Sequence, residues 1–225
     1  MTIWIIFIGV ALLSWLASWQ LKSRFRKYSK LTLANGITGK DVVEKMLRDN
    51  NVSGVKIGSV AGQLTDHYNP ATKTINLSKE VYNGNNVAAA AVAAHECGHA
   101  IQHAKAYSML GIRSKLVPVV SFASGWMHWV ILAGILTVQV FPALLLAGIV
   151  LFSFTTLFTV VTLPVEVDAS RRALVWLSDA GITSSQNHEK AKDALKWAAY
   201  TYFIAAIGSI ASLIYYILIF VGARD

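Results

Sequence analysis

Long stretches without charge dominate the pattern of hydrophobic and polar positions along the chain. Residues 1–21, 116–165 and 197–223 contain no Asp, Glu, Lys or Arg. A helix needs about 20 predominantly apolar residues to cross the hydrocarbon core of a bilayer, so the first and third stretches fit one membrane helix each. The middle stretch is long enough for two helices joined by a tight turn. The pattern therefore predicts about four transmembrane helices, over residues 3–21, 117–138, 142–163 and 199–221.

The first apolar stretch has the length of a secretory signal peptide but not its layout. Signal peptides carry positive charge before the apolar region and small residues at a cleavage site after it. Here the basic residues follow the stretch, and the bulky Trp15, Trp19 and Leu21 line its exit. We therefore expect an uncleaved membrane anchor.

Two polar segments separate the apolar stretches. In residues 22–115, two short runs on either side of the Asn69–Thr72 turn suggest a β-hairpin, and an Ala-rich helix is expected from residue 87 to about 109. Residues 164–196 are expected to form helices, the first of which begins near Pro164. The predicted fold class is therefore mostly α and integral to a membrane, with a short β-hairpin or sheet in its polar part.

The distribution of charge predicts a topology. Charged residues make up only 14% of the chain, whereas about a quarter is usual for soluble proteins. The formal net charge is +8, and every Lys and Arg except Arg224 lies in residues 22–115 or 164–198. Because Lys and Arg near membrane helices stay on the cytoplasmic side, both polar segments are expected in the cytoplasm. Their basic residues are expected to face anionic lipid headgroups and not nucleic acid. The lone Cys97 also fits a reducing compartment.

The Ala-rich helix contains the motif His95-Glu96-Cys97-Gly98-His99. Residues four apart lie on one face of a helix, so both imidazoles can bind one ion. Two neutral imidazoles and a carboxylate suit a catalytic zinc ion, and a neighbouring Glu can act as general base. The motif predicts one zinc ion per chain, with Glu96 as the catalytic base. His103 is too far along the helix axis to be a ligand as well, and is expected to be a polar-face or outer-shell residue.

The third ligand is expected among the few acids downstream of the motif. Glu166 and Asp168 follow two predicted membrane crossings, so they return to the same side of the membrane as His99. Glu166 is the expected ligand, and Asp168 is the alternative. In the hairpin, His67 and its neighbours are candidates for substrate binding or oxyanion stabilisation, or they only shape the turn.

With these motifs the chain resembles a known family, the YugP-like neutral zinc metallopeptidases of bacterial membranes. The resemblance covers nearly the whole chain and is carried by the N-terminal anchor and by residues 64–70, 93–103 and 163–173. The chain is more distantly similar to HtpX-type proteases and CAAX prenyl endopeptidases, gluzincins whose third ligand is a Glu that opens an E-x-x-A-D helix. This resemblance implies that His95, His99 and Glu166 bind zinc. The later Asp of that pattern aligns with Ser170, and an acid stands at Asp168 instead.

These observations predict a membrane-embedded zinc metalloendopeptidase. Its expected substrates are peptides or segments of membrane proteins, cleaved at the cytoplasmic face of a bacterial inner or plasma membrane that the chain crosses several times. The alternatives are an intramembrane protease of the site-2 type and a zinc-binding scaffold without turnover. No protein partner or oligomeric state is indicated. The expected parts are an anchor (1–21), a cytoplasmic peptidase part with the HExxH helix (22–115), a transmembrane hairpin (116–163), cytoplasmic helices with the third ligand (164–198) and a C-terminal transmembrane helix (199–225).

Overall fold

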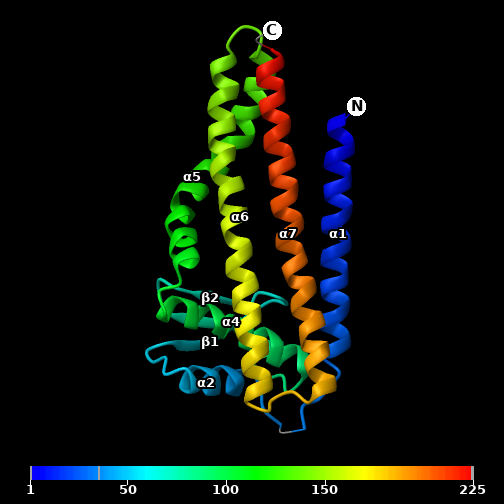
Figure 1. Cartoon of the computed structure of the whole chain (residues 1–225), viewed down its shortest axis with the longest axis vertical. Helices are drawn as coiled ribbons and strands as arrows, with labels where there is room; N and C mark the ends of the chain where they lie inside the picture. The colour runs from blue at the N-terminus through cyan, green and yellow to red at the C-terminus, as the bar shows by residue number, and fades with distance from the viewer. Residues whose placement is uncertain (1, 35, 224–225) are drawn as a thin grey trace. The chain divides into compact units, whose positions relative to one another are not determined.

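The computed structural model describes residues 2–34 and 36–223, without the side chains of residues 2–6, and it is mostly helical (Figure 1). The helices are α1 (Thr2–Tyr28), α2 (Gly39–Asp49), α3 (Lys79–Tyr82), α4 (Val87–Ala104), α5 (Ser108–Thr137), α6 (Pro142–Asp179) and α7 (Ser185–Gly222). The strands are β1 (Lys56–Val60), β2 (His67–Asn69) and β3 (Thr74–Ser78).

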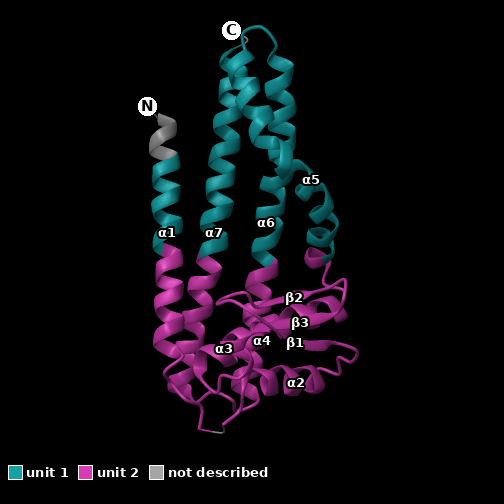
Figure 2. Cartoon of the chain, turned by 180° about the vertical axis from the view of Figure 1, so that it is seen from behind, with its two compact units in different colours: residues 1–16, 111–164, 201–225 teal, residues 17–110, 165–200 magenta. Residues whose placement is uncertain are grey.

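The chain forms two compact units, coloured in Figure 2. The first contains residues 1–16, 111–164 and 201–225, and the second contains residues 17–110 and 165–200. The long helices α1, α5, α6 and α7 each contribute to both units.

The first unit consists of apolar helices. Within the described residues, α5, α6 and α7 are long and apolar enough to cross a membrane, and they contain three of the four expected spans. Large apolar side chains such as Trp129 and Leu136 are 70% and 78% exposed, which suits contact with lipid. Gly134 lies against the backbone of Leu145, because a Cβ there would come within 2.6 Å of the Leu145 Cα; small residues allow such close packing of membrane helices. The fourth expected span, 3–21, falls within α1 but includes side chains outside the described part of the chain.

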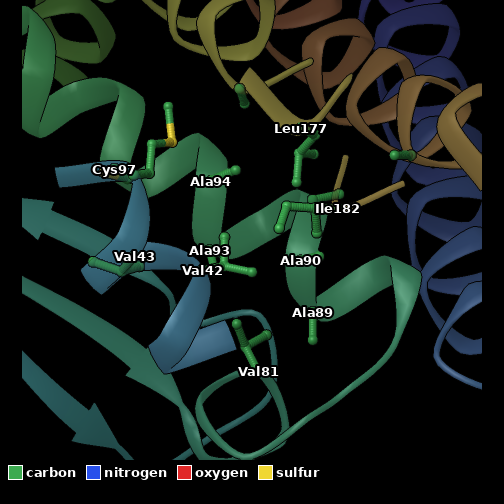
Figure 3. Close-up of a cluster of buried hydrophobic side chains, with 14 of the residues drawn as sticks. Val42, Val43, Val81, Ala89, Ala90, Ala93, Ala94, Cys97, Leu177 and Ile182 are labelled. Carbon is green, nitrogen blue, oxygen red and sulfur yellow. The ribbon is translucent and has the colours of Figure 1, made fainter. Parts of the chain in front are cut away.

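The second unit is built around α4. Asn86 caps this helix by accepting a hydrogen bond from the Ala89 N–H at 2.9 Å. Side chains from α2, α3, α6 and the loop after α6 surround its Ala-rich face, as Figure 3 shows. The small side chains of Ala90, Ala93 and Ala94 are at most 1% exposed, so the neighbouring elements approach the helix axis closely. This packing holds α4 in the core of the second unit and so fixes the position of its last two turns.

A three-stranded sheet lies beside α4 in the described part of the second unit. The expected hairpin is present: β2 pairs antiparallel with β3, with Tyr68 opposite Ile75. The other edge of β3 pairs in parallel with β1, so the strand order is β1-β3-β2. The hairpin loop puts Lys73 at a φ of 50°.

Two expected helix boundaries were wrong. The Ala-rich helix ends at Ala104 and not near residue 109, because Ala106 adopts a φ of 51° that turns the chain before α5 begins. The helix expected to begin near Pro164 is instead the continuation of α6, with Pro164 inside it. Proline removes one backbone donor from a helix, and the apolar residues on both sides of Pro164 continue the helix through it. Glu166 therefore lies on the same helix as the preceding apolar stretch.

Candidate metal centre

Three residues of the second unit converge on one point. His95 and His99 are one turn apart on α4, and their ring centroids lie 4.8 Å from each other. Glu166 reaches them from α6. The two helices can approach because Gly98 has no side chain: a Cβ there would lie 2.7 Å from the carbonyl oxygen of Ala169. The glycine within the motif therefore sets the distance between the imidazoles and the carboxylate.

The geometry of these residues fits a zinc ion. Nε2 of His95 and Nε2 of His99 lie 3.2 Å and 3.5 Å from the same Glu166 carboxylate oxygen, Oε2. In the part of the chain that the structure describes, these three residues form a group of side chains that could hold a metal ion, with one ligand atom from each within 4.8 Å of the others. Tetrahedral zinc with bonds of about 2.0–2.2 Å places its ligand atoms about 3.4 Å apart. The observed separations therefore suit these three side chains as zinc ligands.

The surroundings of Glu166 favour the ionised form of its carboxyl group. Only 2% of the residue is exposed, and burial opposes its ionisation, but the contacts with His95 and His99 lower its pKa below the usual value. For His99, burial lowers the pKa and the Glu166 carboxylate raises it, with a net increase. The three groups thus form a buried site in which a negative charge lies against two imidazoles, an arrangement that favours a cation.

A buried amide fixes the orientation of His99. The Gln102 side-chain nitrogen donates to the Val165 carbonyl at 2.8 Å and to Asp168 Oδ2 at 2.9 Å. Its oxygen must then face His99, whose Nδ1 lies 3.0 Å away. An amide oxygen only accepts, so Nδ1 of His99 carries a proton, and Nε2, which faces Glu166, is the nitrogen that can offer its lone pair to a metal ion. Such outer contacts set the tautomer of metal-binding histidines.

His95 is held in the same way by a different residue. Its Nδ1 lies 3.1 Å from the Ser170 hydroxyl, which can accept from an Nδ1–H and leave Nε2 free for a metal. Ser170 stands one helical turn after Glu166, at the position where the resembling proteases have an Asp. A hydroxyl therefore contacts His95 where that pattern places a carboxylate.

Asp168 does not join the three converging residues. Its carboxylate accepts from Gln102, from Arg171 Nη2 at 2.8 Å and from Arg172 Nε at 2.6 Å. Burial raises its pKa and these three donors lower it, with a net decrease. Asp168 thus contacts the three converging residues only indirectly, through Gln102.

Glu96 follows His95 directly on α4 and is 8% exposed. Its negative charge acts on His99 and raises the pKa of that imidazole, so the carboxyl group lies near the converging residues. The same charge also reaches Asp66, whose pKa is raised mainly by burial. Asp66 accepts hydrogen bonds from the backbone N–H and the hydroxyl of Ser78, which ties the strand ends to this side of the site.

The two remaining candidate histidines lie outside the group. Nδ1 of His67 is 2.8 Å from the Thr65 carbonyl, and its Nε2 is 3.1 Å from the Asn76 amide nitrogen. His103 contacts the Tyr68 hydroxyl through Nδ1 at 2.7 Å. His67 therefore contacts strand β3, and His103 links α4 to strand β2. Burial raises the pKa of the Tyr68 hydroxyl.

Sequence reasoning did not single out Gln102 as part of the site. A signal was available, because Gln102 follows His99 by three residues and so shares its helix face. Ser170 was noted only as a departure from a pattern, although it follows Glu166 by four residues.

A buried His-His-Glu group beside a carboxylate, in a chain with apolar helices long enough to cross a membrane, is typical of a membrane metallopeptidase. The chain belongs to the family described as "Putative neutral zinc metallopeptidase", whose model matches residues 3–221. It is 39% identical over 222 residues to "Putative membrane protease YugP" of Bacillus subtilis strain 168, covering 98% of each chain. No solved structure matched the chain.

Proposed function

We propose that this protein is a zinc metalloendopeptidase of the HExxH gluzincin type, which hydrolyses peptide bonds in peptides or membrane-protein segments. The convergence of His95, His99 and Glu166 next to Glu96 carries the proposal. These three residues would hold one zinc ion per chain. The membership of a zinc metallopeptidase family and the likeness to a protein named as a membrane protease support it.

The residues of the site have distinct roles in this proposal. Zinc bound by the three residues supplies a Lewis acid that polarises the scissile carbonyl and lowers the pKa of water. Glu96 takes the proton from the attacking water and gives it to the leaving amine. Ser170 and Gln102 keep the Nε2 lone pairs of His95 and His99 aimed at the metal position. Asp168 holds Gln102 in place and does not touch the substrate.

We propose further that cleavage takes place at the cytoplasmic face of a bacterial inner membrane that the chain crosses several times. The concentration of Lys and Arg in residues 22–115 and 164–198 supports this orientation. The site residues belong to the second compact unit, in the parts of the chain that carry these charges. In the described residues, α4 is not among the helices apolar and long enough to cross a membrane, which favours this reading over intramembrane cleavage.

Replacement of Glu96 by Gln tests the proposal. The full-length protein is purified in detergent, its zinc content is measured, and hydrolysis of an unstructured protein substrate such as casein is followed. Glu96→Gln should keep about one zinc per chain and lose at least about 100-fold in hydrolysis, since the general base is removed. Glu189→Gln, on the exposed surface of α7, is the matched control and should behave as wild type. A zinc-loaded wild type whose hydrolysis is equal to that of Glu96→Gln would instead indicate a non-catalytic zinc scaffold.

A further inference from the structure

A groove lies between the second-unit parts of α6 and α7. Its volume is about 660 Å³, and most of the surface that lines it is apolar, although charged and polar residues also line it. Leu195 forms part of its floor and is only 4% exposed. The two helices run antiparallel on either side of a short loop (Figure 1), so Asp179 and His188 close one end of the groove.

The walls of the groove expose apolar surface. Val167 and Val175 of α6 are 50% and 56% exposed. They are eight residues apart, about two helical turns, and therefore lie on one face of α6. Exposed apolar side chains beyond the charge-free stretch of α6 indicate a binding surface.

Basic side chains border the same surface. Arg171 lies on α6 between the two valines; its side chain is 72% exposed and pairs with Asp168 at 2.8 Å. Lys192 and Lys196, four residues apart on one face of α7, also line the groove. Lys192 is only loosely paired with the exposed Glu189, at 3.7 Å. Three cations beside an apolar wall complement an amphiphile with a negatively charged head.

In both helices, the residues that line the groove adjoin a stretch without charged residues. The charge-free stretch of α6 ends at Val165, two residues before Val167. That of α7 begins at Trp197, immediately after Lys196. The ligand is therefore expected from the bilayer that those stretches occupy. We propose that this groove binds an anionic phospholipid, with its phosphate at Arg171, Lys192 and Lys196 and an acyl chain along the two valines.

This binding can be measured without any reference to peptidase activity. Full-length protein in detergent is titrated with phosphatidylglycerol or phosphatidylcholine, and bound lipid is counted by native mass spectrometry. Lys192→Gln and Lys196→Gln should each weaken phosphatidylglycerol binding about fivefold and leave phosphatidylcholine unchanged. The matched control is Lys190→Gln, which removes the same charge from the same helix but outside the groove. Equal loss in Lys190→Gln would overturn the proposal, because it would show general attraction of anions to a basic protein.

A second pair of variants tests the apolar wall. The side chains of Val167 and Val175 are exposed, so replacing either valine by serine should leave the thermal unfolding temperature unchanged. Each replacement should lower phosphatidylglycerol binding several-fold. If these variants bind normally, or if glycerol 3-phosphate alone displaces the lipid at similar concentration, the site is a simple phosphate site and the lipid proposal fails. If the groove variants instead weaken binding of an acidic amphipathic peptide and not of lipid, the groove is a protein-docking surface.

Discussion

The side-chain oxygen of Gln102 lies 3.0 Å from Nδ1 of His99, and its orientation admits one hydrogen-bond pattern. The amide nitrogen of Gln102 donates hydrogen bonds to two acceptors, so its oxygen must accept the hydrogen bond from Nδ1–H of His99. Gln102 is fully buried, and water cannot replace it. A residue outside the His95–His99–Glu166 group thus determines which nitrogen of His99 can bind a metal ion.

Gln102→Leu should therefore weaken zinc binding. The leucine has a similar size but leaves Nδ1 of His99 without its acceptor, and loss of such an outer contact lowers metal affinity about 10- to 100-fold. Competition with a chromophoric chelator measures this affinity, and thermal unfolding of the metal-free protein reports whether the fold is intact. The matched control is Gln63→Leu, at an exposed position paired with Glu80, which should bind zinc as wild type does. A Gln102→Leu protein with unchanged zinc affinity would contradict this role.

Local sequence patterns predicted those elements that are determined by residues close together in the chain. The spacing of His95 and His99 predicted their common helix face, and the turn at Asn69–Thr72 predicted the β2–β3 hairpin, which is confirmed. The parallel pairing of β1 with β3 was not predicted, because no local signal specifies which distant strands pair. The end of α4 was placed too late, since the positive φ of Ala106 depends on the packing of the following helix and not on propensity.

The sequence favoured Glu166 over Asp168 as the third ligand but left Asp168 open. Two positions apart on a helix, the two side chains point about 200° apart, so only one can face His95 and His99. The packed face of α6 contains Glu166, Ala169 and Ser170. Because polar residues stand on several sides of this helical segment, the pattern did not indicate which face would meet α4.

The different surroundings of these two acids predict different effects of their removal. Glu166→Ala should lose zinc, because it removes the atom that lies within 3.2 Å and 3.5 Å of the two histidines. Asp168→Ala should keep about one zinc per chain. It should instead lower the free energy of unfolding by about 1–3 kcal/mol, since the donors of Gln102 and Arg172 lose a buried acceptor. Zinc analysis and denaturant unfolding separate the two effects, and loss of zinc only in Asp168→Ala would reverse the assignment.

The lone cysteine should report on unfolding and not on catalysis. Cys97 is fully buried in the core of the second unit (Figure 3), and burial raises the pKa of its thiol. The thiolate is the reactive form, so iodoacetamide at pH 8 should not modify the folded protein in detergent. Modification should begin at the denaturant concentration where the second unit unfolds, as followed by circular dichroism. Rapid labelling without denaturant would show that α4 opens readily.

Gly98→Ala should damage the site without changing any of its ligands. The added methyl group would lie 2.7 Å from the carbonyl oxygen and 3.1 Å from the Cα of Ala169, and neither backbone atom can rotate away. The α4 and α6 backbones must therefore separate, which draws Glu166 away from the imidazoles on either side of Gly98. We expect weaker zinc binding in the chelator competition and a free energy of unfolding lower by about 1–3 kcal/mol. Gly111→Ala is the control, because a Cβ there meets nothing within 4 Å and alanine is the better helix former. Normal zinc affinity in Gly98→Ala would mean that the distance between the two helices does not determine the metal centre.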